Sequence, residues 1–211
     1  MLTPHLDDLA AAGVKLDHMY TALVCSPSRG SIMTGKFPYR LGLSHGFIAA
    51  GAPYGLPLSE RTMAQEMSTH GWTSHMVGKW HLGMPSWEYT PTYRGFQTHF
   101  GFYNGATDYW AHTHPESSPS SPLDLHWASA PGVPALPVTN LNGTLTKNVS
   151  DYGAFLFARK TIEVIDAHVA AKTDRNSSSG GGGGILPPLF LYLTHQVSLS
   201  LSLSLSLSLS L

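Results

Sequence analysis

The chain has 211 residues, of which 42% are hydrophobic and 12% charged, with 12 Lys and Arg against 13 Asp and Glu. It can bury a sizeable core, and its balanced charge provides no basic field for nucleic acid or an anionic membrane surface. One cysteine excludes an internal disulfide framework. No apolar run is long enough to span a bilayer, and residues 1–13 do not resemble a secretory signal.

The first part of the chain predicts two helices separated by a strand. Thr3 is a suitable N-cap, a proline follows it, and Gly13 is a natural stop, which together predict a helix over residues 4–12. Residues 14–24 are rich in β-formers and predict a strand. Residues 27–35 predict a short second helix.

The middle of the chain predicts one helix, one strand and a long irregular region. Ser59 is a candidate N-cap for a helix that Gly71 ends. Residues 72–80 predict a strand. Residues 85–137 are aromatic and rich in proline, which is typical of surface loops that carry function.

The last part of the chain completes an α/β pattern. Residues 151–172 predict a helix whose apolar side chains recur at helical spacing: Phe155, Ala158, Ile162 and Ile165. Residues 185–196 form an apolar run typical of a strand buried on both faces. Alternating helices and strands predict an α/β fold with a mostly parallel sheet flanked by helices.

Two segments of low complexity fall outside this pattern. Residues 177–184 form a Ser/Gly linker that lacks the Lys and Ser/Thr of a phosphate loop. Residues 198–211 alternate Ser and Leu, a repeat that carries little information for a unique core and is an aggregation hazard when unpaired. We therefore divide the chain into a domain over 1–196, with the linker as an insertion, and a tail over 197–211.

Cys25 lies where a predicted strand gives way to a helix. Backbone N–H groups at a helix start favour an anion, so they lower a thiol pKa or hold an oxyanion. Arg29, four residues on, lies on the same helix face and offers a planar donor fork for a phosphate- or sulfate-like group. On these residues alone, a buried structural cysteine beside an arginine in a surface ion pair is the simpler interpretation.

Lys79 and His81 belong to the motif GKWHLG at the end of the predicted strand over 72–80. If the strand persists, both side chains point to the same side. The carboxyl edge of an open α/β sheet is where ligands bind, so the pair could supply a cation and a proton donor there. Taken alone, a solvated loop is the simpler interpretation.

Other polar residues have weaker claims. His112, His114 and Glu116 could form a metal cluster, but no further ligand is spaced to complete a set, so a polar loop is favoured. Asp108 and Tyr109 lie in the same region and could touch a substrate, although an ordinary loop is again the simpler interpretation.

Three N-glycosylation triplets begin at Asn142, Asn148 and Asn176. Such triplets arise by chance, but three in one region favour a secretory route. Because residues 1–13 do not resemble a signal, we expect an N-terminal part to be missing from this sequence.

Two motifs together resemble the sulfatase family. CSPSRGSIMTG, residues 25–35, resembles the first sulfatase signature, and GWTSHMVGKWHLG, residues 71–83, resembles the second, in the family's order and spacing. TPHLDDLAAAGVKLDHMYT and RGFQTHFGFYNGATDYWAH are similar to the arylsulfatase B-like branch. The resemblance is strong over 3–112, returns at ARKTIEVIDAHV and PPLFLYLTHQ, and stops at Val197.

The resemblance implies an incomplete sulfatase/alkaline-phosphatase-like fold and hydrolysis of sulfate esters. It implies that a formylglycine-generating enzyme oxidises Cys25 during secretion, with Pro27 and Arg29 in the recognised signal. A hydroxyl of the hydrated aldehyde then attacks sulfur and displaces the alcohol, and the hemiacetal collapses to release sulfate. Arg29 anchors the formylglycine, Lys79 binds sulfate, and His81 hydrogen-bonds the formylglycine hydroxyl. Calcium bridges formylglycine and sulfate, so Cys25 becomes a metal ligand after modification.

The chain departs from the family pattern at several points. The paired aspartates of the family precede the start of this resemblance, and Asp7 and Asp8 fall inside the helix over 4–12, where a solvated face is favoured. The second catalytic histidine normally follows a strand like FLYLTHQ, but here Gln196 is followed by the Ser-Leu repeat, and His195 is not assigned the role. The family's second calcium pair and second sulfate-binding lysine lie beyond this point. We therefore expect weak or no activity from these 211 residues.

The branch suggests sulfated amino sugars of glycosaminoglycans as substrates and a lysosomal or secreted location. Two alternatives stay open. The chain could be a catalytically dead fragment that binds sulfated glycans, or it could belong to a phosphomonoester or phosphonate hydrolase on the same scaffold.

Overall fold

The computed structural model describes residues 3–114, 123–138, 152–177, 186–196 and 205–206. Its strands form one sheet in the order β4-β3-β2-β1-β5-β6. The bounds are Thr73–Lys79 for β1, Thr98–Phe102 for β2, His126–Ala128 for β3, Leu136–Pro137 for β4, Leu189–Thr194 for β5 and Leu205–Ser206 for β6. β1 is parallel to both β2 and β5, and the remaining pairs are antiparallel. The sheet is therefore mixed, with a parallel centre, and the α/β prediction is confirmed.

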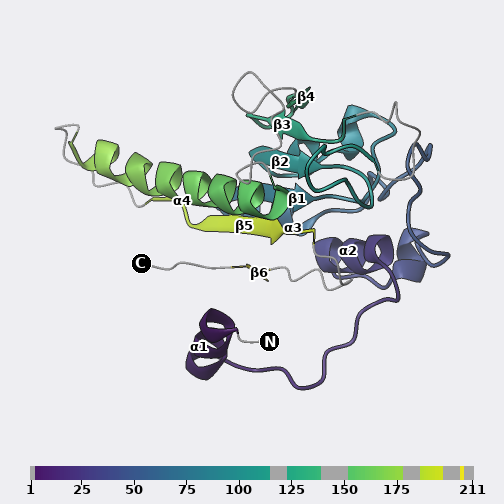
Figure 1. Cartoon of the computed structure of the whole chain (residues 1–211), viewed down its shortest axis with the longest axis horizontal. Helices are drawn as coiled ribbons and strands as arrows, with labels where there is room; N and C mark the ends of the chain where they lie inside the picture. The colour runs from purple at the N-terminus through teal and green to yellow at the C-terminus, as the bar shows by residue number, and fades with distance from the viewer. Residues whose placement is uncertain (1–2, 115–122, 139–151, 178–185, 197–204, 207–211) are drawn as a thin grey trace.

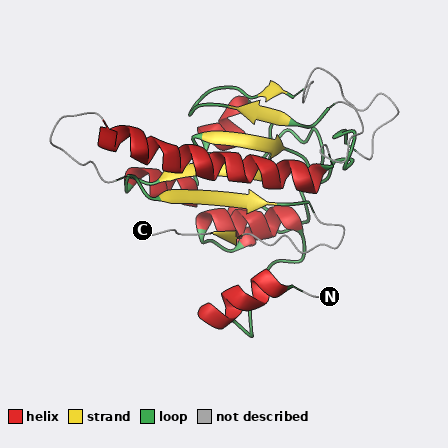
Figure 2. Cartoon of the chain, turned by 60° about the vertical axis from the view of Figure 1, so that its left-hand side comes forward, coloured by secondary structure: helices red, strands yellow, loops and turns green. Residues whose placement is uncertain are grey.

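Four α-helices accompany the sheet: α1 Pro4–Ala12, α2 Cys25–Thr34, α3 Met63–Thr69 and α4 Gly153–Ser177. Three short 3₁₀-helices complete the described elements: η1 Pro38–Leu41, η2 Trp87–Tyr89 and η3 Pro91–Tyr93. Figures 1 and 2 show α4 running along the sheet, with α2 on the opposite side of β5. The fold is thus layered, with helices against both faces of the sheet.

Alternation along the central strands builds a separate core on each face of the sheet. Met76 and Tyr192 point into a cluster that includes Met33 of α2. Their neighbours Val77 and Leu191 point into a second cluster on the opposite face, with α4. Because successive side chains of a strand point to opposite faces, both faces of β1 and β5 are buried. This explains why the predicted strand over 185–196 is a continuous apolar run.

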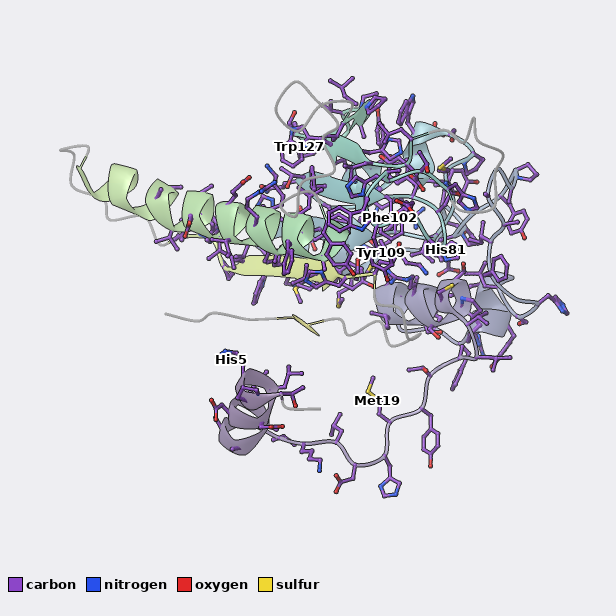
Figure 3. The ribbon with its side chains drawn as sticks, in the orientation of Figure 1. His5, Met19, His81, Phe102, Tyr109 and Trp127 are labelled. Carbon is purple, nitrogen blue, oxygen red and sulfur yellow. The ribbon has the colours of Figure 1, made fainter. Side chains whose placement is uncertain are left out.

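The predicted strand over residues 14–24 is wrong. The segment follows α1 as an extended chain without strand pairing, and no residue in the range 3–24 is buried. Tyr20 and Leu23 are 88% and 98% exposed. Figure 3 shows Met19 and His5 well away from the sheet that holds Phe102. β-Propensity measures the fit to a neighbouring strand rather than an intrinsic backbone preference, so an unpaired segment stays irregular.

Two other boundaries differ from the predictions. α3 begins at Met63 rather than near Ser59, because Thr62 and Gln65 form a reciprocal capping box. The region 85–137 is not only loop, because it contributes β2 to the centre of the sheet and β3 and β4 to its edge. β2 has burial on both faces without strict alternation, so it resembles an aromatic loop in sequence.

The predicted apolar stripe of the long helix is also partly wrong. Phe155 and Ile162 are 57% and 58% exposed, whereas Leu156 and Phe157 are 2% exposed and pack on the sheet. The helix is therefore rotated from the predicted face. Among the described residues, no helix is both long and apolar enough to cross a membrane.

Candidate active site

Cys25 is the first residue of α2 and keeps a free, partly exposed thiol. Val24 precedes it in an extended conformation, and no side chain caps the helix start. The backbone N–H groups of a helix start that are left without side-chain acceptors favour an anion. Although no strand precedes Cys25, the predicted helix start is present and begins two residues earlier than expected.

The end of β1 meets α2 at one backbone carbonyl. Lys79 is the last residue of β1, and its carbonyl oxygen accepts a hydrogen bond from Arg29 Nη1 at 2.5 Å. Thr194 Oγ1, at the end of β5, donates to the same oxygen at 2.8 Å. The Lys79 ammonium lies close enough to Cys25 for that residue to raise the pKa of Lys79. The structure therefore brings Cys25, Arg29 and Lys79 together at the carboxyl edge of the sheet.

This edge holds two cations without a carboxylate partner among the described residues. Arg29 is 2% exposed, and its Nε and Nη2 atoms lack hydrogen-bond partners. Burial lowers the pKa of Arg29, although Tyr192 and Cys25 oppose this. Burial, followed by the charge of Arg29, lowers the pKa of Lys79, while Cys25 raises it. Buried donors and positive charge without an internal anion are the features expected of a site for an external one.

His81 lies two residues beyond β1 in a constrained conformation. Its φ is 54°, in the left-handed region that costs a non-glycine residue about 1–2 kcal/mol. Its backbone N–H donates to Tyr103 O at 3.1 Å, and its ring Nε2 lies 2.9 Å from Ile48 O. Because a carbonyl only accepts, Nε2 carries the proton, and Nδ1 is buried without a partner. Burial, reinforced by Lys79, lowers the His81 pKa to about 4, so the ring is neutral at pH 7.

Ser26 links α2 to the loop that holds His81. Its Oγ accepts the backbone N–H of Ile48 at 3.0 Å, while the carbonyl of Ile48 accepts the His81 ring. Ile48 therefore connects the start of α2 to the His81 ring through its own backbone N–H and carbonyl groups. Ser26 itself is fully buried.

Both glycines of GKWHLG lie where a side chain would collide with a neighbouring backbone. A Cβ on Gly78, whose φ is 105°, would lie 2.0 Å from Thr194 O, so only glycine lets β1 pass β5 there. A Cβ on Gly83 would lie 2.4 Å from Gly55 Cα. Trp80 between them is fully buried, and its indole N–H donates to Tyr89 O at 3.0 Å.

The weaker candidates lie elsewhere. His112 and His114 are buried, Glu116 lies outside the described residues, and no group of three metal-ligating side chains occurs in the described part of the chain. Asp108 accepts two backbone N–H groups of its own turn, from Trp110 and Ala111, as an ordinary polar loop does.

Tyr109 stacks on Tyr152 with ring centroids 5.2 Å apart. Asp7 and Asp8 are exposed on α1, as predicted for a solvated face.

The glycosylation triplets fall mostly on residues that the structure does not describe. Asn142 and Asn148 lie outside the described residues, and Asn176 lies in the last turn of α4. Of the linker over 177–184, only Ser177, at the end of α4, is described. Of the tail over 197–211, only the two residues of β6 are described.

The described residues do not provide a calcium cage. Calcium takes six to eight hard oxygen ligands, whereas the thiol of Cys25 is a soft ligand and no acidic cluster surrounds it among the described residues. The fit to calcium therefore rests on conversion of Cys25 and on ligands other than those seen here.

Sequence reasoning missed several residues that shape this site. Thr194 and Ser26 act through single hydroxyl groups, and their only sequence signal is their position beside a strand end or a motif cysteine. Asp124, a buried carboxylate just before β3, lies in the region predicted to be loop. Its two backbone partners, the N–H groups of Tyr103 and Asn104, lie 21 and 20 residues away in the sequence and leave no local pattern.

Comparisons with known proteins agree with the two motifs. The sulfatase family model matches residues 1–172. Arylsulfatase J from Mus musculus is 34% identical over 92% of this chain and 28% of its own length. Arylsulfatase A from Homo sapiens is 39% identical over 47% of this chain and 20% of its own length. The chain thus spans less than a third of the curated relatives it matches.

Solved structures share the fold. A structure titled "Crystal structure of Ps i-CgsB" aligns with a TM-score of 0.67 and 24% identity, over 93% of this chain and 40% of that one. The PsFucS1 sulfatase from Pseudoalteromonas sp. aligns with a TM-score of 0.61 and 20% identity, over 80% and 36% of the two chains. At these identities the likeness concerns the fold alone.

Proposed function

The chain belongs to the sulfatase family, and we propose that the whole protein hydrolyses sulfate esters at the site formed by α2 and the end of β1. The observation that carries this proposal is the meeting of Cys25, Arg29 and Lys79 at the carboxyl edge of the sheet. A buried guanidinium whose Nε and Nη2 nitrogens lack partners, together with a nearby ammonium, suits a divalent oxyanion.

Each of these residues has a distinct part in the proposal. Cys25, once oxidised to formylglycine, supplies the nucleophilic hydroxyl at the start of α2. Arg29, one helical turn further along α2, anchors that residue. Lys79 binds the sulfate group and neutralises the charge that develops on it. His81 presents its unpartnered Nδ1 as a hydrogen-bond acceptor for the formylglycine hydroxyl, since Nε2 is held by Ile48.

The proposal extends to partners and location. A formylglycine-generating enzyme acts on Cys25 during secretion. The converted residue would offer an oxygen ligand to calcium, together with ligands from outside the described residues. The three glycosylation triplets support passage through the secretory route towards a lysosomal or extracellular location. Sulfated glycosaminoglycans are the proposed substrate class, and the arylsulfatase B-like assignment within the family stays a prediction.

Mass spectrometry of the Cys25 peptide, after secretion from cells that contain the modifying enzyme, tests the first step. The proposal expects a formylglycine in place of the thiol, and no conversion in Arg29→Ala. If Cys25 remains a thiol in the secreted chain, the proposed nucleophile is wrong.

An ester assay then separates the proposed reaction from its alternatives. A complete version of the protein should hydrolyse an aryl sulfate faster than the matched aryl phosphate, and a Cys25→Ala version should hydrolyse neither. We infer that the 211-residue chain itself shows weak or no turnover, because its described residues lack a calcium cage. Faster phosphate hydrolysis would favour the phosphatase alternative, and glycan binding without turnover by the complete version would favour the binding protein.

A further inference from the structure

We propose that Asp124 is a positioning residue for His81, acting through the turn that follows β2. The role assigned to His81 rests on the proposed function, whereas the link between the two residues rests on hydrogen bonds and packing alone. Asp124 is 3% exposed and lies just before β3, on the far side of β2 from β1.

The carboxylate of Asp124 binds the two residues after β2 with both oxygens. Oδ1 accepts the backbone N–H of Tyr103 at 2.9 Å, and Oδ2 accepts the backbone N–H of Asn104 at 2.9 Å. Oδ2 also accepts the side-chain amide of Asn104 at 2.8 Å, and His126 Nε2 lies 3.0 Å from Oδ1. Four donors on one buried carboxylate fix both the position and the direction of the turn.

The turn held in this way contacts His81 twice. The carbonyl of Tyr103 accepts the His81 backbone N–H, so the left-handed conformation of His81 is held from this side. Gly105 lies against the imidazole, where an added Cβ would come within 2.8 Å of His81 Cε1. A residue in a sparsely populated conformation persists only when its surroundings over-determine it. Movement of the turn over 103–105 is therefore transmitted to both the backbone and the ring of His81.

Aromatic stacking makes the turn rigid. The ring of Tyr103 lies between two histidines, with centroids 5.3 Å from His99 and 4.4 Å from His126. Burial raises the pKa of Asp124, but hydrogen bonds from His126, Tyr103 and Asn104 outweigh it, so the pKa lies below its usual range. The carboxylate stays ionised and keeps all of its acceptor sites in the neutral range.

Asp108 offers a matched control within the same chain. It too is a carboxylate that accepts two backbone N–H groups, from Trp110 at 2.9 Å and from Ala111 at 2.6 Å. It is exposed, and these two donors belong to its own turn. Asp108→Asn and Asp124→Asn therefore make the same chemical change in two turns, only one of which contacts His81.

The experiment measures amide hydrogen exchange and the ring ¹⁵N signals of His81 in the full 211-residue chain. The unsubstituted chain should show a protected His81 amide and a single Nε2–H tautomer. In Asp124→Asn the amide –NH₂ opposes backbone donors, so protection of the His81 amide should fall at least about tenfold and the ring signals should show mixed tautomers. Asp108→Asn should leave both readouts unchanged. Retention of the His81 amide protection and of the single tautomer in Asp124→Asn overturns the proposal.

Amides of β1 such as Met76 report whether the sheet persists in each variant. If Asp124→Asn loses that protection, the decision rests on His126→Phe, which keeps a ring on Tyr103 and removes one donor from the carboxylate. That variant should lower His81 amide protection about threefold with β1 intact, and an unchanged His81 overturns the proposal. Sulfate titration of the unsubstituted chain is independent of this result, so its failure would count against the proposed function and not against the positioning role.

Discussion

Residues 3–24 and residues 25–105 carry similarly clear sequence signals, but only the second segment is packed. α1 forms where its proline and glycine predict it, yet none of its residues is buried. α2 is only one residue longer than α1 and buries five of its ten residues, including Arg29 and Met33. The difference is not in the helices themselves but in what they contact.

This contrast shows what turns local structure into a site. A helix start and stop are decided within a few residues, so α1 needs no partner to match its prediction. The site needs atoms from several elements to converge, as they do at the Lys79 carbonyl, which Arg29 of α2 and Thr194 of β5 both bind. The comparison predicts that equal substitutions will have very unequal effects in the two segments.

The largest effect is expected from Gly78→Ala, within the packed segment. The added Cβ would lie 2.0 Å from Thr194 O, so β1 and β5 must separate. We expect a loss above about 4 kcal/mol in the free energy of unfolding, measured by urea denaturation. Gly71→Ala is the control, because its φ is also positive but nothing lies within 4 Å of the added Cβ, and it should cost only about 1–2 kcal/mol. Equal losses in the two variants would show that the close passage of the strands is not what Gly78 provides.

Two methionines test the comparison with one chemical change. Met33 of α2 is 1% exposed, and Met19 in the segment after α1 is 69% exposed. Met33→Ala should lower the free energy of unfolding by about 2–5 kcal/mol, because it leaves a cavity between α2 and the sheet. Met19→Ala should change it by less than about 0.5 kcal/mol. A large loss in Met19→Ala would mean that residues 14–24 are packed in solution, and the contrast would fail.

Arg29→Met should separate stability from binding. The substitution keeps much of the side-chain volume and removes a buried charge with two unpartnered nitrogen atoms, while Thr194 still binds the Lys79 carbonyl. We expect the free energy of unfolding to rise by about 1–3 kcal/mol and sulfate binding to be lost. Arg40→Met, at an exposed arginine, should alter neither. A marked destabilisation by Arg29→Met would assign Arg29 to the fold rather than to an anion.

The last prediction concerns how stability depends on pH, where the effect of one small pH step is the smallest of the four. Burial lowers the pKa of His99 to about 3, against about 6.5 for an unfolded histidine. Between these values the unfolded chain binds more protons, so His99 makes the free energy of unfolding fall as the pH drops from about 6.5 towards 3, by up to about 1.4 kcal/mol per pH unit. In His99→Phe the free energy of unfolding should fall less steeply over this pH range. His70→Phe, at an exposed histidine, should leave the slope unchanged. The measurement is urea denaturation at several pH values. An unaltered slope in His99→Phe would contradict the role given to His99.

The elements predicted well are those with local or periodic signals. The two-faced apolar run of β5 and the glycine-bounded strand β1 could be identified because each is defined by its own residues. The strand predicted over 14–24 failed because it requires a neighbour that the described residues do not place beside it. β2 was missed because its aromatic and glycine residues resemble those of the surrounding loops.

The candidate site divides in the same way. Spacing alone left Cys25, Arg29, Lys79 and His81 with simpler interpretations, and the resemblance of their two motifs to the sulfatase signatures singled them out. The structure places them around one edge of the sheet. The hydrogen bonds that hold them could not be predicted, because they join backbone atoms to side chains far away in the sequence. The separation is 33 residues for the His81 ring and Ile48 O, 50 for Arg29 and Lys79 O, and 115 for Thr194 and the same oxygen. Asp124 is the clearest case, since its partners depend on how β2 and β3 pair.

The central claim is that α2 and the end of β1 form one anion site, and a sulfate titration of the 211-residue chain tests it most directly. Followed by NMR, the unsubstituted chain should show saturable shifts at the Cys25 and Lys79 amides. Lys79→Ala should abolish this saturation, whereas Lys15→Ala, in the exposed N-terminal segment, should retain it. Saturation that persists unchanged in Lys79→Ala, or the absence of any shift at Cys25, would contradict the account.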